Sequence, residues 1–306
     1  MPDETDELIA GIRRLKEERA ALILSHYYQR PEVQDIADFI GDSLELSRRA
    51  AATSAQVLVF CGVHFMAETA AILSPEKVVV IPDLEAGCPL AAMATPEALR
   101  ARKEQLPGAA VISYVNTTAA VKAESDIVCT SANAARVVRS LPPEQEVLFV
   151  PDRNLGQYVA SQNPGRRMVL WDGYCYVHDQ IRAADIRKAK EEHPAALVLA
   201  HPECRPEVLA LADKVASTSG IIRFARESEA REFIIVTEEG LLHQLRKECP
   251  DKDFYLASPR LVCPDMKRIT LAKVYRSLSD LEPRVEVPEP VRERAVRAVE
   301  RMLAIS

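Results

Sequence analysis

The feature of this sequence that most constrains its fold is a segment that recurs three times. The copies are AALILSH from Ala20, AAVISYVN from Ala109 and AALVLAHPE from Ala195, with starts 89 and 86 residues apart. Such an interval holds one small domain and is too long for one unit of a solenoid repeat. The chain of 306 residues is therefore predicted to contain three related domains.

Each copy is a short, unbroken apolar run that ends in polar residues, as expected for a central strand of a parallel sheet buried on both faces. A second set of runs follows in VLVFCGVH from Val57, DIVCTSAN from Asp126 and DKVASTSG from Asp213. A third set follows in VVVIPDLEAG, VLFVPDRNLG and FIIVTEEG. Helical patterns separate the runs, so we predict an α/β fold whose ligands bind beyond the carboxyl ends of the strands.

The repeat also predicts where the domains begin and end. We place them at residues 1–106, 107–192 and 193–272. Beyond the third domain, the stretch VRERAVRAVERMLAI carries Val291, Ala295, Ala298 and Met302 on one helical stripe. We therefore expect a C-terminal helix over 273–306 that packs back on the first domain.

Charge and hydropathy argue against two classes of partner. The formal net charge is -6, whereas nucleic-acid binders carry an excess of Lys and Arg. No apolar run approaches the roughly 20 residues that span a bilayer. The first twenty residues lack the apolar core of a secretory signal. We expect a cytoplasmic protein that binds neither nucleic acid nor membrane.

Cysteines are present in an odd number, seven, and without an export signal they are expected to stay reduced. Three of them keep register with the repeat, because Cys88, Cys175 and Cys263 lie 68, 66 and 68 residues after the start of their copies. The four that do not recur in this way are Cys61, Cys129, Cys204 and Cys249.

Two interpretations of the three registered cysteines remain open at this point. Soft thiolates suit zinc or an iron-sulfur cluster, and three protein ligands leave one metal position free for a substrate. Alternatively, each cysteine is a small buried apolar residue whose register is inherited from the triplication. Further residues have to decide between them.

Polar side chains occupy matching positions where the first strand of each copy ends. A single His or Tyr is most often a core or surface residue, but three matched strand ends that carry acids, bases and hydrogen-bond donors favour a site. These residues are His26 and Tyr28, Tyr114 and Asn116, and His201 and Glu203.

Hydroxyl residues stand at three expected helix starts, namely Ser43, Ser131 and Thr218. The unpaired N–H groups of a helix N-terminus attract carboxylate or phosphate, which a hydroxyl there can help to hold. For each residue taken alone, simple N-capping is the alternative.

Several longer strings resemble the quinolinate synthase family. They include HYYQ at 26–29, GDSLELSRRA at 41–50, CGVHFMAETAAIL at 61–73 and PDLEAGC at 82–88. The resemblance continues through YVNTTAAVKAESDIVCTSANA, WDGYCYVH, HPEC, STSG and CPDMK, in the order that the family has them. It covers about residues 20–275, which is nearly the whole chain.

This resemblance implies three Rossmann-like αβα domains in a pseudo-threefold arrangement around one central 4Fe-4S cluster. It implies Cys88, Cys175 and Cys263 as the cluster ligands, with one iron site left open. Tyr28 and Glu203 are implied as the proton-transfer pair. The residues implied to line the substrate cavity are His26, Ser43, Tyr114, Asn116, Ser131, His201, Glu203 and Thr218.

Members of this family condense iminoaspartate with dihydroxyacetone phosphate to quinolinate, phosphate and water. The resemblance therefore implies a transferase of NAD biosynthesis that uses these two substrates, with the open iron as a Lewis acid. It also raises a transient contact with an L-aspartate oxidase that would supply the imine. The alternatives are a zinc-dependent lyase acting on a sugar phosphate and a non-catalytic anion-binding protein.

Overall fold

Three parallel sheets of four strands each form the framework of the computed structural model, which describes residues 4–305. The first sheet consists of β1 (Ala21–His26), β2 (Phe39–Gly41), β3 (Val57–Cys61) and β4 (Val78–Val80). The second consists of β5 (Ala110–Tyr114), β6 (Ile127–Cys129), β7 (Val147–Val150) and β8 (Met168–Leu170). The third consists of β9 (Leu197–Ala200), β10 (Lys214–Val215), β11 (Glu232–Val236) and β12 (Asp253–Leu256).

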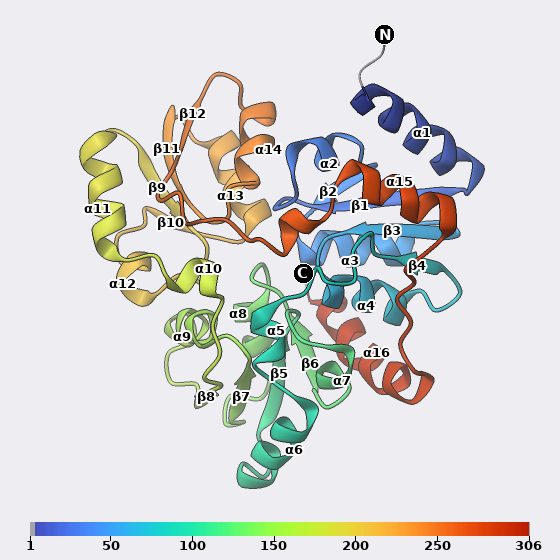
Figure 1. Cartoon of the computed structure of the whole chain (residues 1–306). Coiled ribbons are helices and arrows are strands. Elements are labelled where there is room, and N and C mark those ends of the chain that lie inside the picture. The colour runs from blue at the N-terminus through green and yellow to red at the C-terminus, as the bar shows by residue number, and fades with distance from the viewer. Residues whose placement is uncertain (1–3, 306) are drawn as a thin grey trace.

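The strand order is the same in all three sheets. It reads β2-β1-β3-β4, β6-β5-β7-β8 and β10-β9-β11-β12, and every neighbouring pair is parallel. Three units with one topology lie around a common centre, the first at the upper right of Figure 1, the third at the upper left and the second below. The prediction of an α/β chain with three Rossmann-like αβα domains is confirmed.

Helices cover these sheets and connect their strands. Up to residue 106 the helices are α1 (Glu4–Glu18), α2 (Pro31–Asp35), α3 (Ser43–Ala52), α4 (His64–Leu73), α5 (Pro89–Ala92) and α6 (Pro96–Gln105). From residue 107 to residue 192 they are α7 (Ala119–Lys122), α8 (Ala134–Arg139), α9 (Arg153–Ser161), α10 (Tyr176–Asp179) and α11 (Ala183–Glu192). The remainder contains α12 (Pro206–Leu209), α13 (Thr218–Glu227), α14 (Leu241–Glu248), the 3-10 turn η1 (Met266–Arg268), α15 (Leu271–Asp280) and α16 (Glu289–Ala304). None of the helices within residues 4–305 is both long and apolar enough to cross a membrane.

One side-chain hydrogen bond recurs in every domain and fixes which residues are equivalent. An aspartate directly before the second strand accepts from a backbone N–H of the central strand, which ties the two strands together in one register. The pairs are Asp38 with Ile23 at 2.9 Å, Asp126 with Val111 at 2.7 Å and Asp213 with Val198 at 2.7 Å. Counting from these pairs, His26, Tyr114 and His201 are equivalent, as are Tyr28, Asn116 and Glu203.

Two runs of the first copy were assigned to the wrong strands by the sequence. VLVFCGVH contains β3, the third strand of its domain, and VVVI contains β4, the last. The true second strand, β2, spans only Phe39–Gly41 and has two partly exposed residues, so it leaves no apolar run in the sequence. The equivalents of DIVCTSAN and DKVASTSG are therefore found in DFIGDSLE, residues 38–45.

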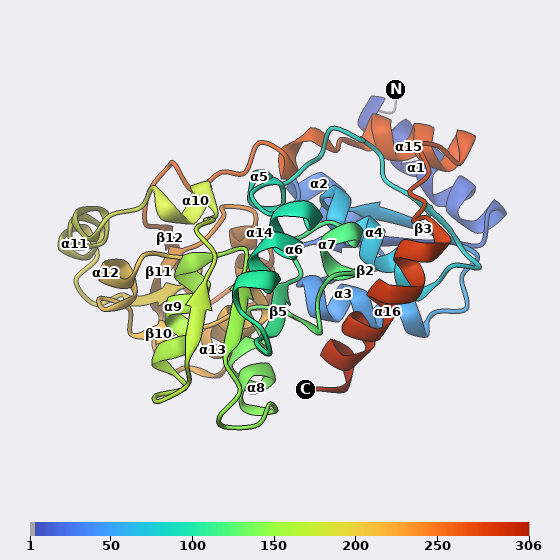
Figure 2. The ribbon, with the colours of Figure 1, turned by 90° about the horizontal axis from the view of Figure 1, so that it is seen from below.

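The expected C-terminal helix over 273–306 is wrong, because this region forms two helices. Between α15 and α16 the chain contains Pro283 and Pro288, which cannot continue a helix, and Leu281 ends α15 in the left-handed conformation. Helix α15 packs on α1 of the first domain. Helix α16 lies against α7 and β6 of the second domain and also against α4 of the first (Figure 2).

A polar contact explains this position of α16. The Asn133 side-chain amide donates to the backbone carbonyls of Met302 at 3.1 Å and Ile305 at 2.9 Å, and so binds the helix end to the second domain. The tail thus bridges two domains instead of covering the first alone. The domain boundaries at 106 and 192 stay predictions.

The recurring aspartate gives a test of the framework. Asp126→Ala leaves the N–H of Val111, a fully buried residue, without its acceptor, and should lower the free energy of unfolding by about 1 kcal/mol. Asp126→Asn keeps an acceptor oxygen and should cost less. Urea unfolding of both variants checks this, with Asp251→Ala on an exposed turn as the control. Equal stability of Asp126→Ala and wild type would contradict the assigned role.

Candidate active site

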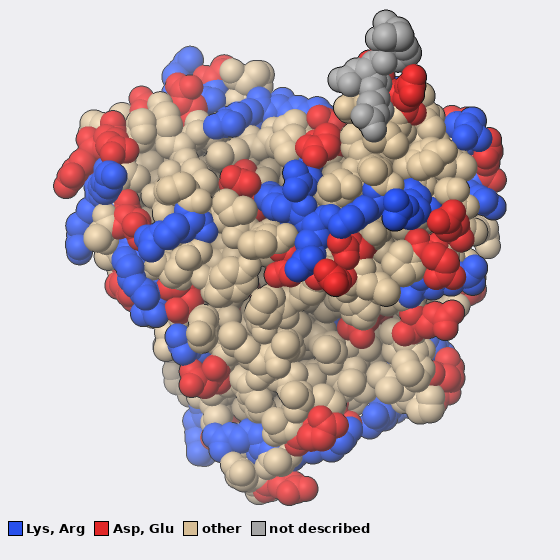
Figure 3. Space-filling view, viewed as in Figure 1, with Lys and Arg blue, Asp and Glu red and all other residues tan. Residues whose placement is uncertain are grey.

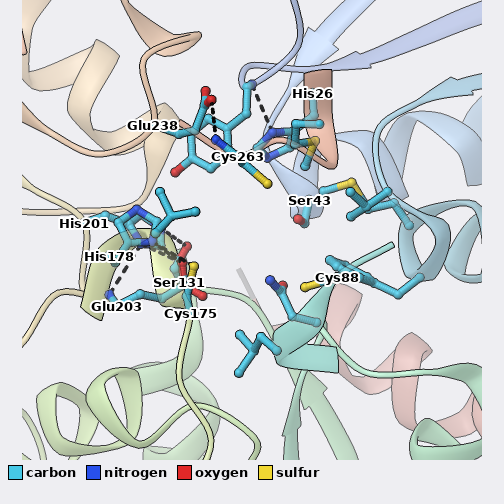
Figure 4. A pocket seen from close by; sticks show the side chains of 18 of the residues that line it. His26, Ser43, Cys88, Ser131, Cys175, His178, His201, Glu203, Glu238 and Cys263 are labelled. Carbon is cyan, nitrogen blue, oxygen red and sulfur yellow. Dashed lines mark hydrogen bonds and ion pairs between the residues drawn. The ribbon is translucent and has the colours of Figure 1, made fainter. Parts of the chain in front are cut away.

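A cavity lies where the carboxyl ends of the central strands of the three domains meet. Figure 4 shows side chains from all three domains pointing into it. The structure brings together there every site residue that the sequence indicated: Cys88, Cys175, Cys263, His26, Tyr28, Ser43, Tyr114, Asn116, Ser131, His201, Glu203 and Thr218. Their individual roles stay predictions.

The three registered cysteines occupy equivalent loops. Cys88 directly precedes α5, Cys175 precedes α10, and Cys263 lies shortly before η1. All three are free thiols on the cavity wall, and their sulfur atoms face a common space (Figure 4). The other four cysteines, which are Cys61, Cys129, Cys204 and Cys249, are buried away from this space. Register in the sequence thus corresponds to convergence in space.

Burial keeps these thiols protonated in the absence of a metal. It raises the pKa of Cys88 to about 12 and that of Cys263 to about 11, and it also raises the pKa of Cys175. A thiolate that forms here needs a cation to stabilise it, and a bound metal does so by displacing the proton. The donor set therefore fits a thiophilic metal centre.

Two buried carboxylates support the cysteine loops. Asp152 accepts from the backbone N–H of Cys175 at 3.0 Å, and Glu238 accepts from that of Cys263 at 3.0 Å. Both acids come two residues after the third strand of their domain, where the first domain has Val63. Sequence reasoning missed them, although the PD of VLFVPDRNLG and the TE of FIIVTEEG follow an apolar run in the same way.

A carboxylate and two imidazoles form the polar centre of the cavity. One oxygen of Glu203, Oε2, lies 3.1 Å from Nδ1 of His201 and 3.2 Å from Nδ1 of His178. On its other side, His201 Nε2 lies 3.2 Å from the hydroxyl of Ser131. Burial alone would raise the pKa of Glu203, but the hydrogen bonds from His178 and His201 outweigh it, so the pKa falls below its usual range.

Tyr28 joins this centre through a threonine that the sequence did not indicate. Its hydroxyl lies 2.5 Å from Oγ1 of Thr237, which lies 2.9 Å from Nε2 of His178. Burial raises the pKa of Tyr28, and the negative charge of Glu203 raises it further. Tyr28 therefore remains a protonated phenol while Glu203 remains a carboxylate.

His178 is the most important residue that the sequence analysis missed. It lies three residues after Cys175, one helical turn along α10, within the string WDGYCYVH. Its Nδ1 lies 3.2 Å from the Cys175 sulfur, and it stacks on His201 with ring centroids 4.8 Å apart. The spacing of a cysteine and a histidine on one helical face was the available signal.

Two polar atoms in the cavity wall lack partners. Asn116 Oδ1 and Glu203 Oε1 are buried and accept no hydrogen bond from residues 4–305. They belong to equivalent residues of the second and third domains. Because an unpaired buried acceptor is unfavourable by about 1–3 kcal/mol, these two atoms indicate where a bound molecule would donate hydrogen bonds.

The hydroxyls of the sequence analysis also converge. Ser43 and Thr218 are the first residues of α3 and α13, and Ser131 lies shortly before α8, at the same offset from the recurring aspartate in each domain. Ser219, next to Thr218, donates to Asp42 at 2.6 Å and so connects two of these helix starts. Three hydroxyls from three domains thus line the cavity.

Two sets of side chains could hold a metal. The first is the three cysteines. The second is Cys175, His178 and Glu203, whose ligand atoms all lie within 4.8 Å of one another. Thiolate ligands suit iron-sulfur clusters or zinc, and the mixed set suits zinc.

Comparison with known proteins identifies the family. Residues 10–304 match the family model of the quinolinate synthetase A protein. The chain belongs to the quinolinate synthase family. It is 64% identical to the quinolinate synthase of Desulforudis audaxviator over 303 residues, which covers 99% of this chain and 100% of that protein. The quinolinate synthase of Methanoregula boonei is 55% identical over 303 residues, with the same coverage of both chains. That of Geobacter metallireducens is 54% identical over 302 residues, which covers 99% of each chain.

The buried histidine at the first strand end predicts a pH effect. Burial lowers the pKa of His26 from 6.5 to about 3, and His201 adds to the effect. As the pH falls below 6.5, the unfolded chain binds a proton here that the folded chain does not. The free energy of unfolding should therefore fall, with a slope of up to about 1.4 kcal/mol per pH unit.

This slope can be assigned to His26 by substitution. His26→Gln removes the titrating ring, so the stability of the metal-free protein should depend less steeply on pH between 6.5 and 4.5. Urea unfolding of the variant and of the wild-type protein at three pH values in that range measures the difference. Identical slopes would contradict a neutral buried His26.

Proposed function

We propose that this chain condenses iminoaspartate with dihydroxyacetone phosphate and releases quinolinate, phosphate and two waters. The observation that carries the proposal is the meeting of three registered cysteines with a phenol, a carboxylate and three hydroxyls in one cavity. The family assignment over residues 10–304 supports it. We place the reaction in the cytoplasm, where thiols stay reduced.

The cofactor that we propose is one 4Fe-4S cluster. Cys88, Cys175 and Cys263 would hold three of its irons, and their free thiols, cavity exposure and equivalent loops fit that task. When bound, the cluster supplies an open iron site that acts as a Lewis acid toward a substrate oxygen. The carboxylates of Asp152 and Glu238 hold the loops of Cys175 and Cys263 in place for it.

Proton transfer in this proposal falls to Tyr28 and Glu203. Their opposite pKa shifts keep one as an acid and the other as a base over the neutral pH range. Thr237 and His178 connect the two groups by hydrogen bonds of 2.5, 2.9 and 3.2 Å. A proton that Tyr28 gives to a leaving hydroxide could thus be restored along this chain of groups.

The remaining cavity residues would hold the substrates. Two carboxylates and a phosphate need hydrogen-bond donors, which the hydroxyls of Ser43, Ser131 and Thr218 supply beside helix N-termini. The amide of Asn116 adds a donor, and its unpaired oxygen accepts from a substrate N–H or O–H. We assign His26, Tyr114 and His201, at matching strand ends, to the same binding role.

Imines hydrolyse in water, so the supply of iminoaspartate matters. A transient contact with an L-aspartate oxidase would shorten the exposure of the imine to water. We include that contact in the proposal as a partner interaction. The proposal includes neither nucleic acid nor membrane, and basic and acidic side chains are interspersed on the face that Figure 3 shows.

A zinc enzyme is the second candidate, because Cys175, His178 and Glu203 lie close enough together to bind one zinc ion. Metal content distinguishes the two. An anaerobically purified protein that is brown, contains iron and sulfide and makes quinolinate supports the cluster. A colourless, zinc-containing preparation with lyase activity on a sugar phosphate would replace the proposal.

The ligand assignment makes a direct prediction. Cys88→Ser, Cys175→Ser and Cys263→Ser should each lose the cluster, because only these thiols face the cavity together. Iron and sulfide per chain after anaerobic reconstitution measure this. The matched controls are Cys61→Ser, Cys129→Ser, Cys204→Ser and Cys249→Ser, which should bind a full cluster. A folded control variant without iron would show the assignment to be wrong.

The acid–base pair makes a second prediction. Tyr28→Phe keeps the ring and Glu203→Gln keeps the shape, so the cluster absorbance should stay as in wild type. Each variant should form quinolinate about 100- to 10,000-fold more slowly, the usual contribution of a general acid or base. Initial rates in an anaerobic assay measure this. Near wild-type turnover in a cluster-replete variant would refute the role of that residue.

A further inference from the structure

Two buried polar side chains lie beneath the loops that carry Tyr28 and Asn116. They are Gln34 and Lys122, both completely inaccessible to solvent. Neither lines the cavity, and neither has a role in the proposed reaction. Their hydrogen bonds show what they hold.

Each of these side chains reaches the carbonyls on both sides of one cavity residue. Lys122 Nζ donates to the carbonyl of Val115 at 2.9 Å and also to that of Thr117, the two neighbours of Asn116. Gln34 Nε2 lies 3.0 Å from the carbonyl of Tyr27 and 2.9 Å from that of Gln29, the two neighbours of Tyr28. The same nitrogen lies 3.0 Å from the carbonyl of Gly240, and the Gln34 side-chain oxygen accepts from Gln244 at 3.0 Å.

The two contacts are equivalent in the triplicated fold. Gln34 and Lys122 each come six residues after the cavity residue whose loop they hold. In both, the backbone N–H donates to the carbonyl four residues earlier at 3.0 Å. Leu209 occupies the same position in the third domain, with the same backbone bond of 3.0 Å but no polar side chain. There, Asn154 of the second domain donates to the carbonyl of Glu203 itself at 3.1 Å.

Burying a lysine ammonium is unfavourable, so packing alone does not explain Lys122 at this position. Its ammonium contacts two carbonyls and the Phe65 ring 5.4 Å away, and the negative charge of Glu68 only partly offsets the effect of burial. Burial lowers its pKa to about 8, which shows the unfavourable environment of the charge. Leu209 demonstrates that the fold accepts an apolar side chain here. The lysine is therefore explained by the carbonyls that it holds.

Asn116 needs such support because, within the described residues, no hydrogen bond to its side-chain oxygen, Oδ1, fixes the orientation of its amide. Asn116 Oδ1 accepts no hydrogen bond from residues 4–305, so nothing in that part of the chain fixes the amide from the cavity side. The backbone of 115–117 must then set its direction. A shift of this backbone would move the amide away from a bound substrate.

We propose that Lys122 and Gln34 are matched positioning residues, which fix the backbone around Asn116 and Tyr28 and so aim these two side chains into the cavity. The kinetic consequence rests on the proposed function, whereas the structural consequence does not. The two can therefore be tested separately.

Hydrogen–deuterium exchange tests the structural part in any folded preparation. Lys122→Met keeps the length of the side chain and removes its donors, so amide exchange within 115–119 should rise at least about tenfold. Gln34→Met should raise exchange within 27–30 and leave 115–119 unchanged. Lys103→Met is the matched control, since Lys103 likewise donates to a backbone carbonyl, that of Glu124 at 2.8 Å, two residues after Lys122. Unchanged exchange at 115–119 in Lys122→Met would overturn the proposal.

A double-mutant cycle tests the kinetic part. Lys122→Met should lower kcat/KM about 10- to 100-fold while iron content stays that of wild type. In an Asn116→Ala background the same substitution should lower it less than about threefold, because the residue to be positioned is gone. If the double variant loses kcat/KM by the full product of the two single-variant losses, Lys122 does not act through Asn116, and this part of the proposal is overturned. A wild-type protein that makes no quinolinate would refute the proposed function but leave the exchange result decisive.

A second variant, Lys122→Gln, tests the proposal even if Lys122→Met does not fold. Lys122→Gln introduces the residue that the first domain has at this position, and it keeps two donors on one nitrogen. It should retain exchange protection and kcat/KM within about threefold of wild type. Losses in Lys122→Gln as large as those from removing Asn116 would overturn the equivalence with Gln34.

Discussion

The central strands of three domains end at one place, and the chemistry of the molecule depends on this constraint. Residues that lie almost ninety positions apart in the chain share one cavity because each domain repeats the same strand order and the same aspartate bond at its second strand. No single domain contains a complete site. Each provides one cysteine, one strand-end pair and one hydroxyl, so the cavity forms only when all three pack together.

Electrostatic balance in the cavity depends on Glu203. A buried carboxylate without partners would be protonated, and two imidazoles at 3.1 and 3.2 Å prevent this. The charge that they stabilise in turn raises the pKa of Tyr28. Burial raises the pKa of Tyr28 and of Tyr114, and the charge of Glu203 adds to this effect, whereas the hydrogen bond between Tyr28 and Thr237 lowers the pKa of Tyr28. Within residues 4–305 the other oxygen of this carboxylate, Glu203 Oε1, has no hydrogen-bond partner.

The sequence predicted the features that follow the repeat and missed those that do not. The triplication, the registered cysteines and the matched strand ends are periodic, so they could be found without coordinates. Strand β2 was missed because it spans only three residues, two of them partly exposed, and so leaves no apolar run. Asp152, Glu238 and Thr237 follow third strands, and the misassigned runs of the first copy hid their equivalence. The position of α16 depends on Asn133, far away in the sequence, and no local pattern encodes such a contact.

A symmetric framework with asymmetric residues explains how one repeated unit can build a site for an unsymmetrical reaction. Tyr28, Asn116 and Glu203 occupy one equivalent position, and they are a phenol, an amide and a carboxylate. Three carboxylates in one buried cavity would repel one another, which raises their pKa values and favours the protonated form. In the proposed reaction, divergence at this single position supplies a proton donor, a neutral hydrogen-bonding group and a base at equivalent strand ends. The framework fixes where functional groups meet, and substitution within it decides what they do.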